Sequence, residues 1–171
     1  MKFFITFSTS DNRYMDGALR LIKTVKKNNI FDNIKIITDK DLKDDKTFWN
    51  EHGEFIEKNK HKGYGYWLWK PYKIKKYLDK LNNDKILFYL DCDCLLKNNK
   101  YLIETNQRQG GTNMFLVCDK VKNLVNEWYK ISCNYKLLDD TIILDNIDTF
   151  KAHRHDQSIF SLLTKKYNIY S

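Results

Sequence analysis

The stretch 85-KILFYLDCDCLL-96 decides the fold class of this 171-residue chain. Mostly apolar residues lead directly into two aspartates, Asp91 and Asp93, which one cysteine separates. Alternate residues of a strand share a face, so a strand over 85–92 is apolar on both faces until it reaches Asp91. This pattern is typical of a central strand that helices cover on both faces, and ligands of open α/β sheets bind at the carboxyl ends of the strands. The stretch therefore predicts an α/β protein with a site at Asp91 and Asp93.

Strands and helices alternate along the rest of the chain. Apolar periodicity predicts strands at 2–8, 33–39 and 113–119, and helices over 13–28, from Pro71 to about Leu81, over 121–131 and after His155. Residues 40–62 are polar and predict a surface excursion with one helical turn near Thr47–His52, and 136–151 predict one strand and a turn. We expect a single domain over 1–171, with a mixed, mainly parallel sheet and helices on both faces.

The two aspartates favour a bound cation. Two carboxylates on one side of an ideal strand are about 6.6–7 Å apart, and closer if the chain bends there. Without a partner, each would raise the pKa of the other, and a divalent cation reverses that penalty. Carboxylate oxygens suit Mg²⁺ or Mn²⁺, which keep coordination positions for water and phosphates. The open alternative is that Asp91 and Asp93 are solvated turn residues.

Two other segments combine residue types that suit a binding site. In 63-GYGYWLWKPY-72, flexible glycines, several rings and Lys70 could contact a base or sugar and a phosphate, whereas core packing is the alternative for each ring. In 153-HRHDQS-158, His153 or His155 could be a further metal ligand and Arg154 a phosphate partner, with Asp156 near a reacting sugar or its acceptor. The alternative is capping, since an acidic residue in the first turn favours the positive end of a helix.

The charge and cysteine content narrow the class of protein. Lysine supplies most of the formal charge of +8 and falls on the polar sides of the predicted helices, which indicates a solvated surface. No familiar nucleic-acid motif is present, although a basic surface suits an anionic substrate such as a nucleotide. The four cysteines lack the spacing of zinc ligands and are interpreted as small buried residues in a reducing compartment. Since no signal peptide or membrane span is apparent, the predicted location is the cytoplasm.

Taken in order, these segments resemble a known family. The first strand, W-x-W-K-P-Y, the strand ending in D-x-D and the terminal H-D-Q-S resemble the small GT-A-fold glycosyltransferases found among polysaccharide-synthesis proteins of bacteria and large DNA viruses. The resemblance covers Lys2 to about Leu163 and implies a Rossmann-like nucleotide-diphospho-sugar transferase fold. It also implies a nucleotide-diphosphate sugar as donor, with UDP favoured, and a glycan-type acceptor.

The resemblance also implies a role for each site residue. Asp91 would face the ribose and a metal-bound water, and Asp93 would ligate Mn²⁺ or Mg²⁺, with a nearby histidine, His153 or His155, completing the metal shell. Asp156, with Gln157, matches an element that lies beside the anomeric carbon in related transferases, which favours a retaining reaction. In the alternative, an inverting reaction, Asp156 would be the base that takes the proton of the acceptor hydroxyl. By the same resemblance, Lys70 and Arg154 would contact the phosphates of the donor. The residues that would lie along the nucleoside are Thr6, Phe7 and Ser8.

Two departures from the family and two alternative functions stay open at this point. Many relatives have a small residue in place of Asp93, and the region after Gly111 is short for acceptor binding. A non-catalytic nucleotide-sugar-binding module of the same fold is therefore one alternative. The other is a phosphatase of the haloacid dehalogenase type, whose D-x-D motif ends in Thr or Val where this chain has Leu95 and lies near the N-terminus instead of mid-chain.

Overall fold

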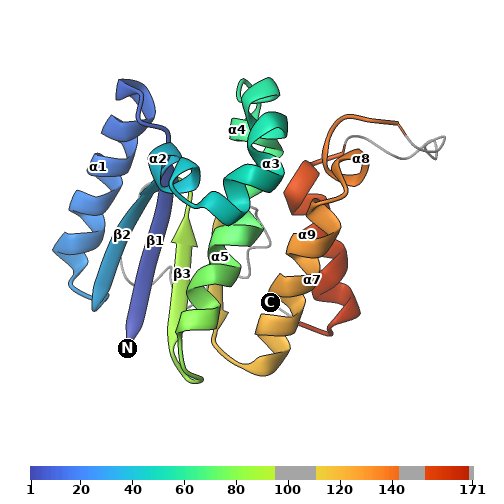
Figure 1. Cartoon of the computed structure of the whole chain (residues 1–171). Coiled ribbons are helices and arrows are strands. Elements are labelled where there is room, and N and C mark those ends of the chain that lie inside the picture. The colour runs from blue at the N-terminus through green and yellow to red at the C-terminus, as the bar shows by residue number, and fades with distance from the viewer. Residues whose placement is uncertain (95–110, 143–152, 170–171) are drawn as a thin grey trace. The chain divides into compact units, whose positions relative to one another are not determined.

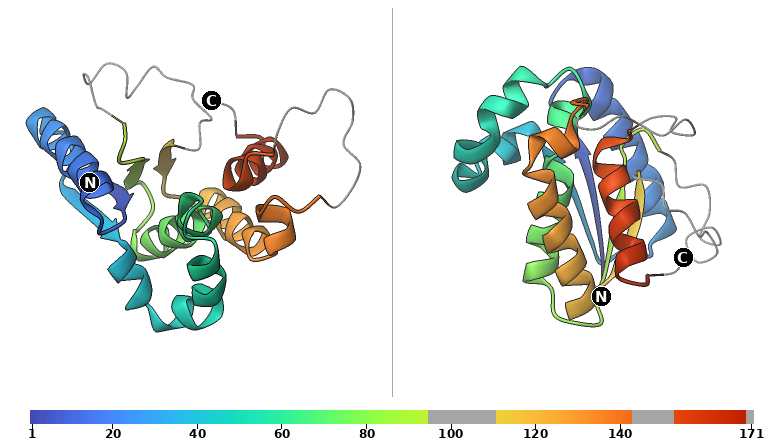
Figure 2. Two further views of the ribbon diagram at one scale, coloured as in Figure 1. Left: turned by 90° about the horizontal axis from the view of Figure 1, so that it is seen from above. Right: turned by 90° about the vertical axis from the view of Figure 1, so that its right-hand side faces the viewer.

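The computed structural model describes residues 1–94, 111–142 and 153–169, which fall into two compact units. Unit 1 comprises Met1–Gly53 and Leu81–Cys118, and unit 2 comprises Glu54–Lys80 and Asp119–Tyr170. Figures 1 and 2 show the sheet of unit 1 and the helices of unit 2.

Unit 1 is built on a four-stranded sheet with the strand order β2-β1-β3-β4. Both neighbours of β1 run parallel to it, whereas β4 runs antiparallel to β3. The predicted mixed, mainly parallel α/β sheet is therefore confirmed. The strand bounds are β1 (Lys2–Ser8), β2 (Asn33–Thr38), β3 (Ile86–Leu90) and β4 (Thr112–Leu116).

The sheet register places three carboxyl ends at one edge. Ile5 of β1 is paired with Tyr89 of β3, and Ser8 of β1 with Thr38 of β2. Because β1, β2 and β3 are parallel, the residues that follow them leave the sheet at the same edge. Figure 1 shows this edge at the arrowhead of β3.

Helix α1 (Asn12–Asn28) covers one face of the sheet, as the periodicity of 13–28 predicts. It begins where the Asp11 carboxylate accepts a hydrogen bond from the Tyr14 amide at 3.1 Å, and it ends at the left-handed Asn29. Figure 2 shows it alongside β1 and β2. Its apolar side chains and those of the strands form one core cluster: Phe4, Leu21, Ile22, Val25, Phe88 and Leu90.

The alternate residues of β3 are buried as well. Leu87 and Tyr89, which point to the face opposite Phe88, are almost inaccessible to solvent. Both faces of β3 are therefore covered, as its apolar sequence predicts.

Residues 40–62 are largely helical, so the predicted surface excursion is wrong. They contain α2 (Asp39–Lys43) and α3 (Lys46–Lys58), the second of which begins in unit 1 and ends in unit 2. Phe48, His52 and Ile56 recur at four-residue steps in α3 and are all buried. This stripe stabilises the helix although its middle member is polar.

Unit 2 consists of helices, in which α7 contacts both α5 and α9. Trp128 of α7 is fully buried, and its ring lies 4.6 Å from that of Phe160 in α9. The predicted apolar stripe of α5 is confirmed, whereas Leu162 of α9 is exposed and does not pack as expected. The helix bounds are α4 (Gly63–Tyr66), α5 (Trp69–Lys80), α7 (Asp119–Ser132), α8 (Tyr135–Leu138) and α9 (His155–Lys166).

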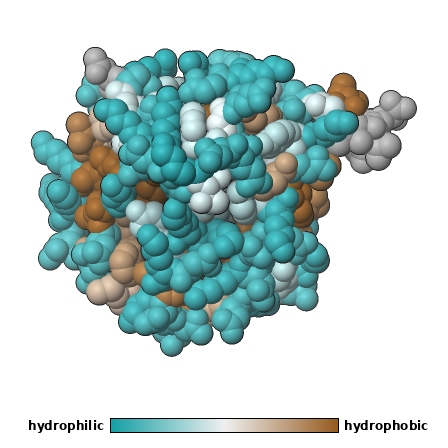
Figure 3. Space-filling model, in the orientation of Figure 1, coloured by the Kyte–Doolittle hydropathy of each residue, from teal (hydrophilic) through white to brown (hydrophobic). Residues whose placement is uncertain are grey.

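Two further sequence predictions concern a strand within residues 136–151 and helices that could span a membrane. The strand and turn expected within 136–151 fall mostly outside the described residues, and the part that is described includes α8. Among the described helices, none has the length and apolar character needed to cross a membrane. Hydrophilic residues cover most of the face drawn in Figure 3.

Candidate functional site

The two aspartates of the D-x-D motif lie in a tight turn at the carboxyl end of β3. The strand ends at Leu90, two residues before the predicted end, and the Cys94 amide donates a hydrogen bond to the Asp91 carbonyl at 3.0 Å. Asp91 is half-buried and Asp93 is exposed. The chain therefore bends at Asp91, which is the case in which the two carboxylates are expected to lie closer together than in an ideal strand.

Neighbouring residues hold the Asp91 side chain in one orientation. Its carboxylate accepts a hydrogen bond from the Tyr89 hydroxyl, and its backbone amide donates to the Gly111 carbonyl at 2.8 Å. A Cβ added at Gly111 would lie 2.7 Å from Asp91 Oδ2, which is shorter than van der Waals contact. Glycine at 111 therefore leaves space beside this carboxylate oxygen.

The end of β1 lies in the strand next to β3. Thr6, Phe7 and Ser8, which are predicted to lie along the nucleoside, are buried there. In the loop that follows, the Ser10 amide donates a hydrogen bond to Asp39 at 2.8 Å, and the Thr9 hydroxyl donates to Asp11. The hydrogen bond from Thr9 lowers the pKa of Asp11. This edge of the sheet therefore carries several carboxylates in addition to those of the D-x-D motif.

The cysteines of the motif act as neutral side chains. Burial, with the charges of Asp93 and Asp91, raises the pKa of Cys92 to about 11 and that of Cys94 to about 11. Cys94 also packs against the core cluster under α1. Protonated thiols are poor nucleophiles and metal ligands, which agrees with the interpretation of both cysteines as spacers.

In unit 2 the structure brings Lys70 and Asp156 together. Lys70 Nζ lies 3.6 Å from Asp156 Oδ2, and the two residues are only 2% and 4% exposed. The Trp128 indole donates a hydrogen bond to the Asp156 carbonyl at 3.0 Å, which fixes the start of α9. The sequence predicts both residues for the site but not this pairing.

His155 is buried against two rings of the 63–72 segment and against two residues outside the predicted motifs. Its Nδ1 lies 2.9 Å from the Leu138 carbonyl, and its Nε2 lies 3.8 Å from Asp140 Oδ1. Its ring is stacked on that of Trp67, with 5.6 Å between centroids, and lies 5.0 Å from that of Tyr66. His155 is therefore held on several sides.

Asp140 connects this histidine to the region before α4. It accepts hydrogen bonds from Lys62 at 2.6 Å and from the Tyr66 hydroxyl at 2.9 Å. The Lys62 contact lowers the pKa of the Asp140 carboxyl. No motif in the sequence pairs Asp140 with residues so far away in the chain, so this network could not have been predicted.

The other two residues of the H-R-H-D segment are more accessible. His153 is half-buried, and both burial and the neighbouring His155 lower its pKa. Arg154 is exposed, and its backbone amide donates to the Ser158 hydroxyl at 2.9 Å. The predicted site residues thus form two groups, one in each unit. Thr6, Phe7, Ser8, Asp91 and Asp93 belong to unit 1, and Lys70, His153, Arg154, His155 and Asp156 to unit 2.

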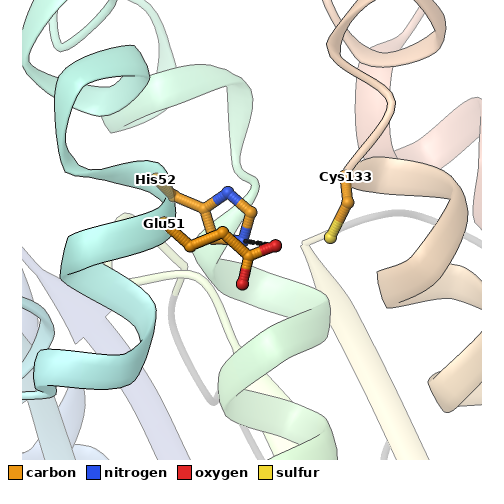
Figure 4. A group of neighbouring side chains, drawn as sticks. All are labelled: Glu51, His52 and Cys133. Atoms are coloured by element: carbon orange, nitrogen blue, oxygen red, sulfur yellow. Dashed lines mark ion pairs between the residues drawn. The ribbon is translucent and has the colours of Figure 1, made fainter.

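A further ionisable pair, Glu51 and His52, lies in α3 (Figure 4). His52 Nε2 is 3.6 Å from Glu51 Oε1, and His52 is 1% exposed. Burial lowers the pKa of His52, and the Glu51 charge opposes that shift only in part. Cys133, which Figure 4 also labels, belongs to unit 2, whereas Glu51 and His52 belong to unit 1.

This buried histidine predicts a loss of stability in mild acid. Because its pKa is lower in the folded chain than the unfolded value of about 6.5, protonation favours unfolding. The stability from neutral His52 is present above pH ~6.5 and is lost as the pH falls through the folded pKa. Urea unfolding as a function of pH should show this loss, and His52→Gln should reduce it. The same change at the exposed His61 should leave it intact, and an equal effect of both substitutions would contradict the assignment.

Comparison with known proteins gives no relative: no protein-family model, curated protein or solved structure matches this chain. Any proposed function must therefore be argued from the residues themselves.

Proposed function

We propose that this protein is a metal-dependent glycosyltransferase of the GT-A fold. It would move a sugar from a nucleotide-diphosphate donor, with UDP favoured, to a hydroxyl group of a glycan-type acceptor in polysaccharide synthesis. The observation that carries the proposal is the position of Asp91 and Asp93 directly after a central, doubly covered strand of a mainly parallel sheet. This is the edge at which α/β proteins bind nucleotides.

The residues at this edge fit a hard divalent cation. Carboxylate oxygens are the ligands that Mn²⁺ and Mg²⁺ prefer. Tyr89 orients the Asp91 carboxylate, and the missing Cβ at Gly111 leaves space beside Oδ2. Asp91 and Asp93 would hold the ion. The further histidine ligand that the resemblance implies, His153 or His155, belongs to unit 2. When bound, the cation supplies positive charge for the departing diphosphate.

The remaining residues take the roles that the family resemblance implies. In the transfer, the bond between the anomeric carbon and the diphosphate oxygen breaks, and a bond from that carbon to the acceptor oxygen forms. In a front-face reaction the proton of the acceptor hydroxyl would pass to the departing diphosphate oxygen, which gains the electron pair of the broken bond. Lys70 and Arg154 would stabilise negative charge on the phosphates, and Asp156 would hold the sugar in a retaining reaction. Thr6, Phe7 and Ser8 would lie along the nucleoside.

Nucleotide binding followed by thermal unfolding tests this proposal. UDP or GDP with Mn²⁺ should stabilise the folded chain by about 2.7 kcal/mol when the ligand is present at 100 times its Kd. Asp93→Ala should remove the metal-dependent part of that shift, whereas Asp16→Asn, a change of an exposed carboxylate on α1, should not. If no nucleoside diphosphate changes the melting temperature with any divalent metal, the donor-site proposal is wrong.

Two activity measurements separate the alternatives. Slow hydrolysis of a nucleotide sugar in Mn²⁺ would exclude a non-catalytic binding module, because even slow turnover needs an assembled site. Hydrolysis of a generic aryl phosphate, without hydrolysis of any nucleotide sugar, would indicate the phosphatase instead.

A further inference from the structure

The segment that leads into α5 has an unusual backbone. All five residues from Gly63 to Trp67 have positive φ, with values of 55°, 51°, 88°, 52° and 59°. The Tyr66 amide donates to the Lys62 carbonyl at 2.8 Å, and the Trp67 amide donates to the Gly63 carbonyl at 3.1 Å. This is a left-handed turn, and three of its five residues are not glycine. Such a conformation is unfavourable for residues with a Cβ, so the surrounding structure must hold it.

A second unfavourable backbone conformation occurs at the start of α9. His155 has φ of 49°, and no side chain caps the helix at Arg154. The His155 ring lies against the rings of Trp67 and Tyr66, which belong to the left-handed turn. Within unit 2, the two strained segments therefore pack on each other.

Each strained segment lies shortly before one member of the buried ion pair, since the left-handed turn ends three residues before Lys70 and His155 directly precedes Asp156. The Lys70 amide donates to the carbonyl of Trp67, the last residue of the left-handed turn, at 2.9 Å. Asp156 follows His155 in the chain, and its carboxylate lies 3.6 Å from Lys70 Nζ. The packing of the rings on His155 thus fixes the backbone on both sides of the pair.

A gain in folding stability explains neither the buried ion pair nor the strained backbone. Replacing a buried ion pair by neutral residues is often neutral or stabilising, and left-handed residues with side chains are destabilising. Strained backbone of this kind gathers at functional sites, where the strain serves to preorganise them. The buried ion pair and the strained backbone both act on the Asp156 carboxylate, which indicates that the position of this carboxylate is important for function.

We infer that Lys70 and His155 are positioning residues that fix the carboxylate of Asp156. Lys70 does so through its charge, and His155 through its packing on the left-handed turn and its contact with the Leu138 carbonyl. The functional part of this inference rests on the proposed function, in which Asp156 holds the donor sugar. It narrows the roles proposed above: His153 is the histidine that would serve the metal, and the exposed Arg154, instead of the buried Lys70, would contact the phosphates.

The first part of the test needs no substrate. Urea unfolding is measured for Lys70→Met, Asp156→Asn and the double variant. Each single change leaves one buried charge without its partner, so the double variant should be more stable than the sum of the single effects. The expected coupling is at least about 10-fold in the unfolding equilibrium constant. In a His155→Asn background, where asparagine tolerates positive φ, the coupling should fall, whereas His61→Asn should leave it unchanged. The inference would be overturned if the Lys70→Met and Asp156→Asn effects were additive, or if the coupling between them were the same with and without His155→Asn.

The second part separates positioning from direct contact. In Mn²⁺-dependent donor hydrolysis, His155→Asn should lower kcat on the order of 10–100-fold at an unchanged apparent Mn²⁺ affinity. Lys70→Met should lower kcat similarly, and Lys70→Arg should restore part of it. A weaker Mn²⁺ affinity with normal kcat at saturating metal would instead make His155 a metal ligand and overturn its positioning role. A wild-type chain that hydrolyses no donor would contradict the proposed function alone, since the unfolding cycle still decides whether Lys70 and His155 fix Asp156.

Discussion

Asp93→Asn is expected to lower Mn²⁺-dependent donor turnover by at least about 100-fold. The exposed Asp93 carboxylate would be lost as a ligand, because a neutral amide binds a divalent cation less tightly than a carboxylate does. The charge that develops on the departing diphosphate would then be poorly compensated. Release of UDP from a sugar donor, measured at saturating donor over a range of Mn²⁺ concentrations, provides the readout.

Stability measurements give the control for this variant. Because Asp93 is exposed and lies in a turn, its replacement should change the free energy of unfolding by no more than about 0.5 kcal/mol. Asp16→Asn on α1 should likewise change the free energy of unfolding by no more than about 0.5 kcal/mol, and it should leave the turnover rate close to that of the original protein. A folded Asp93→Asn protein with normal turnover and normal metal dependence would exclude Asp93 as a metal ligand.

Gly65→Ala is expected to destabilise the chain by about 2–5 kcal/mol. Gly65 has φ of 88°, and an added Cβ would lie 2.8 Å from Ile56 Cγ1 and 3.1 Å from Ile56 Cα. A residue with a Cβ in the left-handed region costs about 1–2 kcal/mol. Overpacking against a buried neighbour adds about 1–3 kcal/mol. Urea unfolding measures the sum as a lower midpoint at a similar slope.

Asn29→Gly is the matched control for the cost of placing a residue with a Cβ in the left-handed region. Asn29 ends α1 in the left-handed region, with φ of 48°, and glycine adopts that conformation at least as readily. Its free energy of unfolding should therefore stay within about 0.5 kcal/mol of the original protein. If Gly65→Ala also changed the free energy of unfolding by no more than about 0.5 kcal/mol, the chain would not adopt the left-handed turn between Gly63 and Trp67 in solution.

The elements with clear periodicity could be predicted from the sequence. The strand β3 is an uninterrupted apolar run, β1 is mostly apolar, and α1 has apolar residues at three- and four-residue steps, so local pattern and burial agree. Only one turn of helix α3 is predicted, near Thr47–His52, because its buried stripe of Phe48, His52 and Ile56 contains a histidine that counts as polar in such a pattern. A histidine at a four-residue step between two apolar residues is the signal that could have revealed it.

The candidate site could be predicted in part. The D-x-D motif stands out because carboxylates rarely follow a buried strand directly, and the structure places it at the expected edge of the sheet. The pairing of Lys70 with Asp156 depends on the left-handed turn, which three non-glycine residues adopt against their intrinsic preference. Tertiary packing decides that conformation, so neither the pairing nor the part played by Asp140 could be derived from local sequence.

The most direct test of the central claim is to locate Mn²⁺ by its anomalous scattering in crystals grown with UDP and Mn²⁺. The proposal predicts an anomalous peak at bonding distance from a carboxylate oxygen of Asp91 or Asp93, next to the diphosphate. A structure with UDP bound elsewhere, or with the Mn²⁺ peak away from both aspartates, would contradict it.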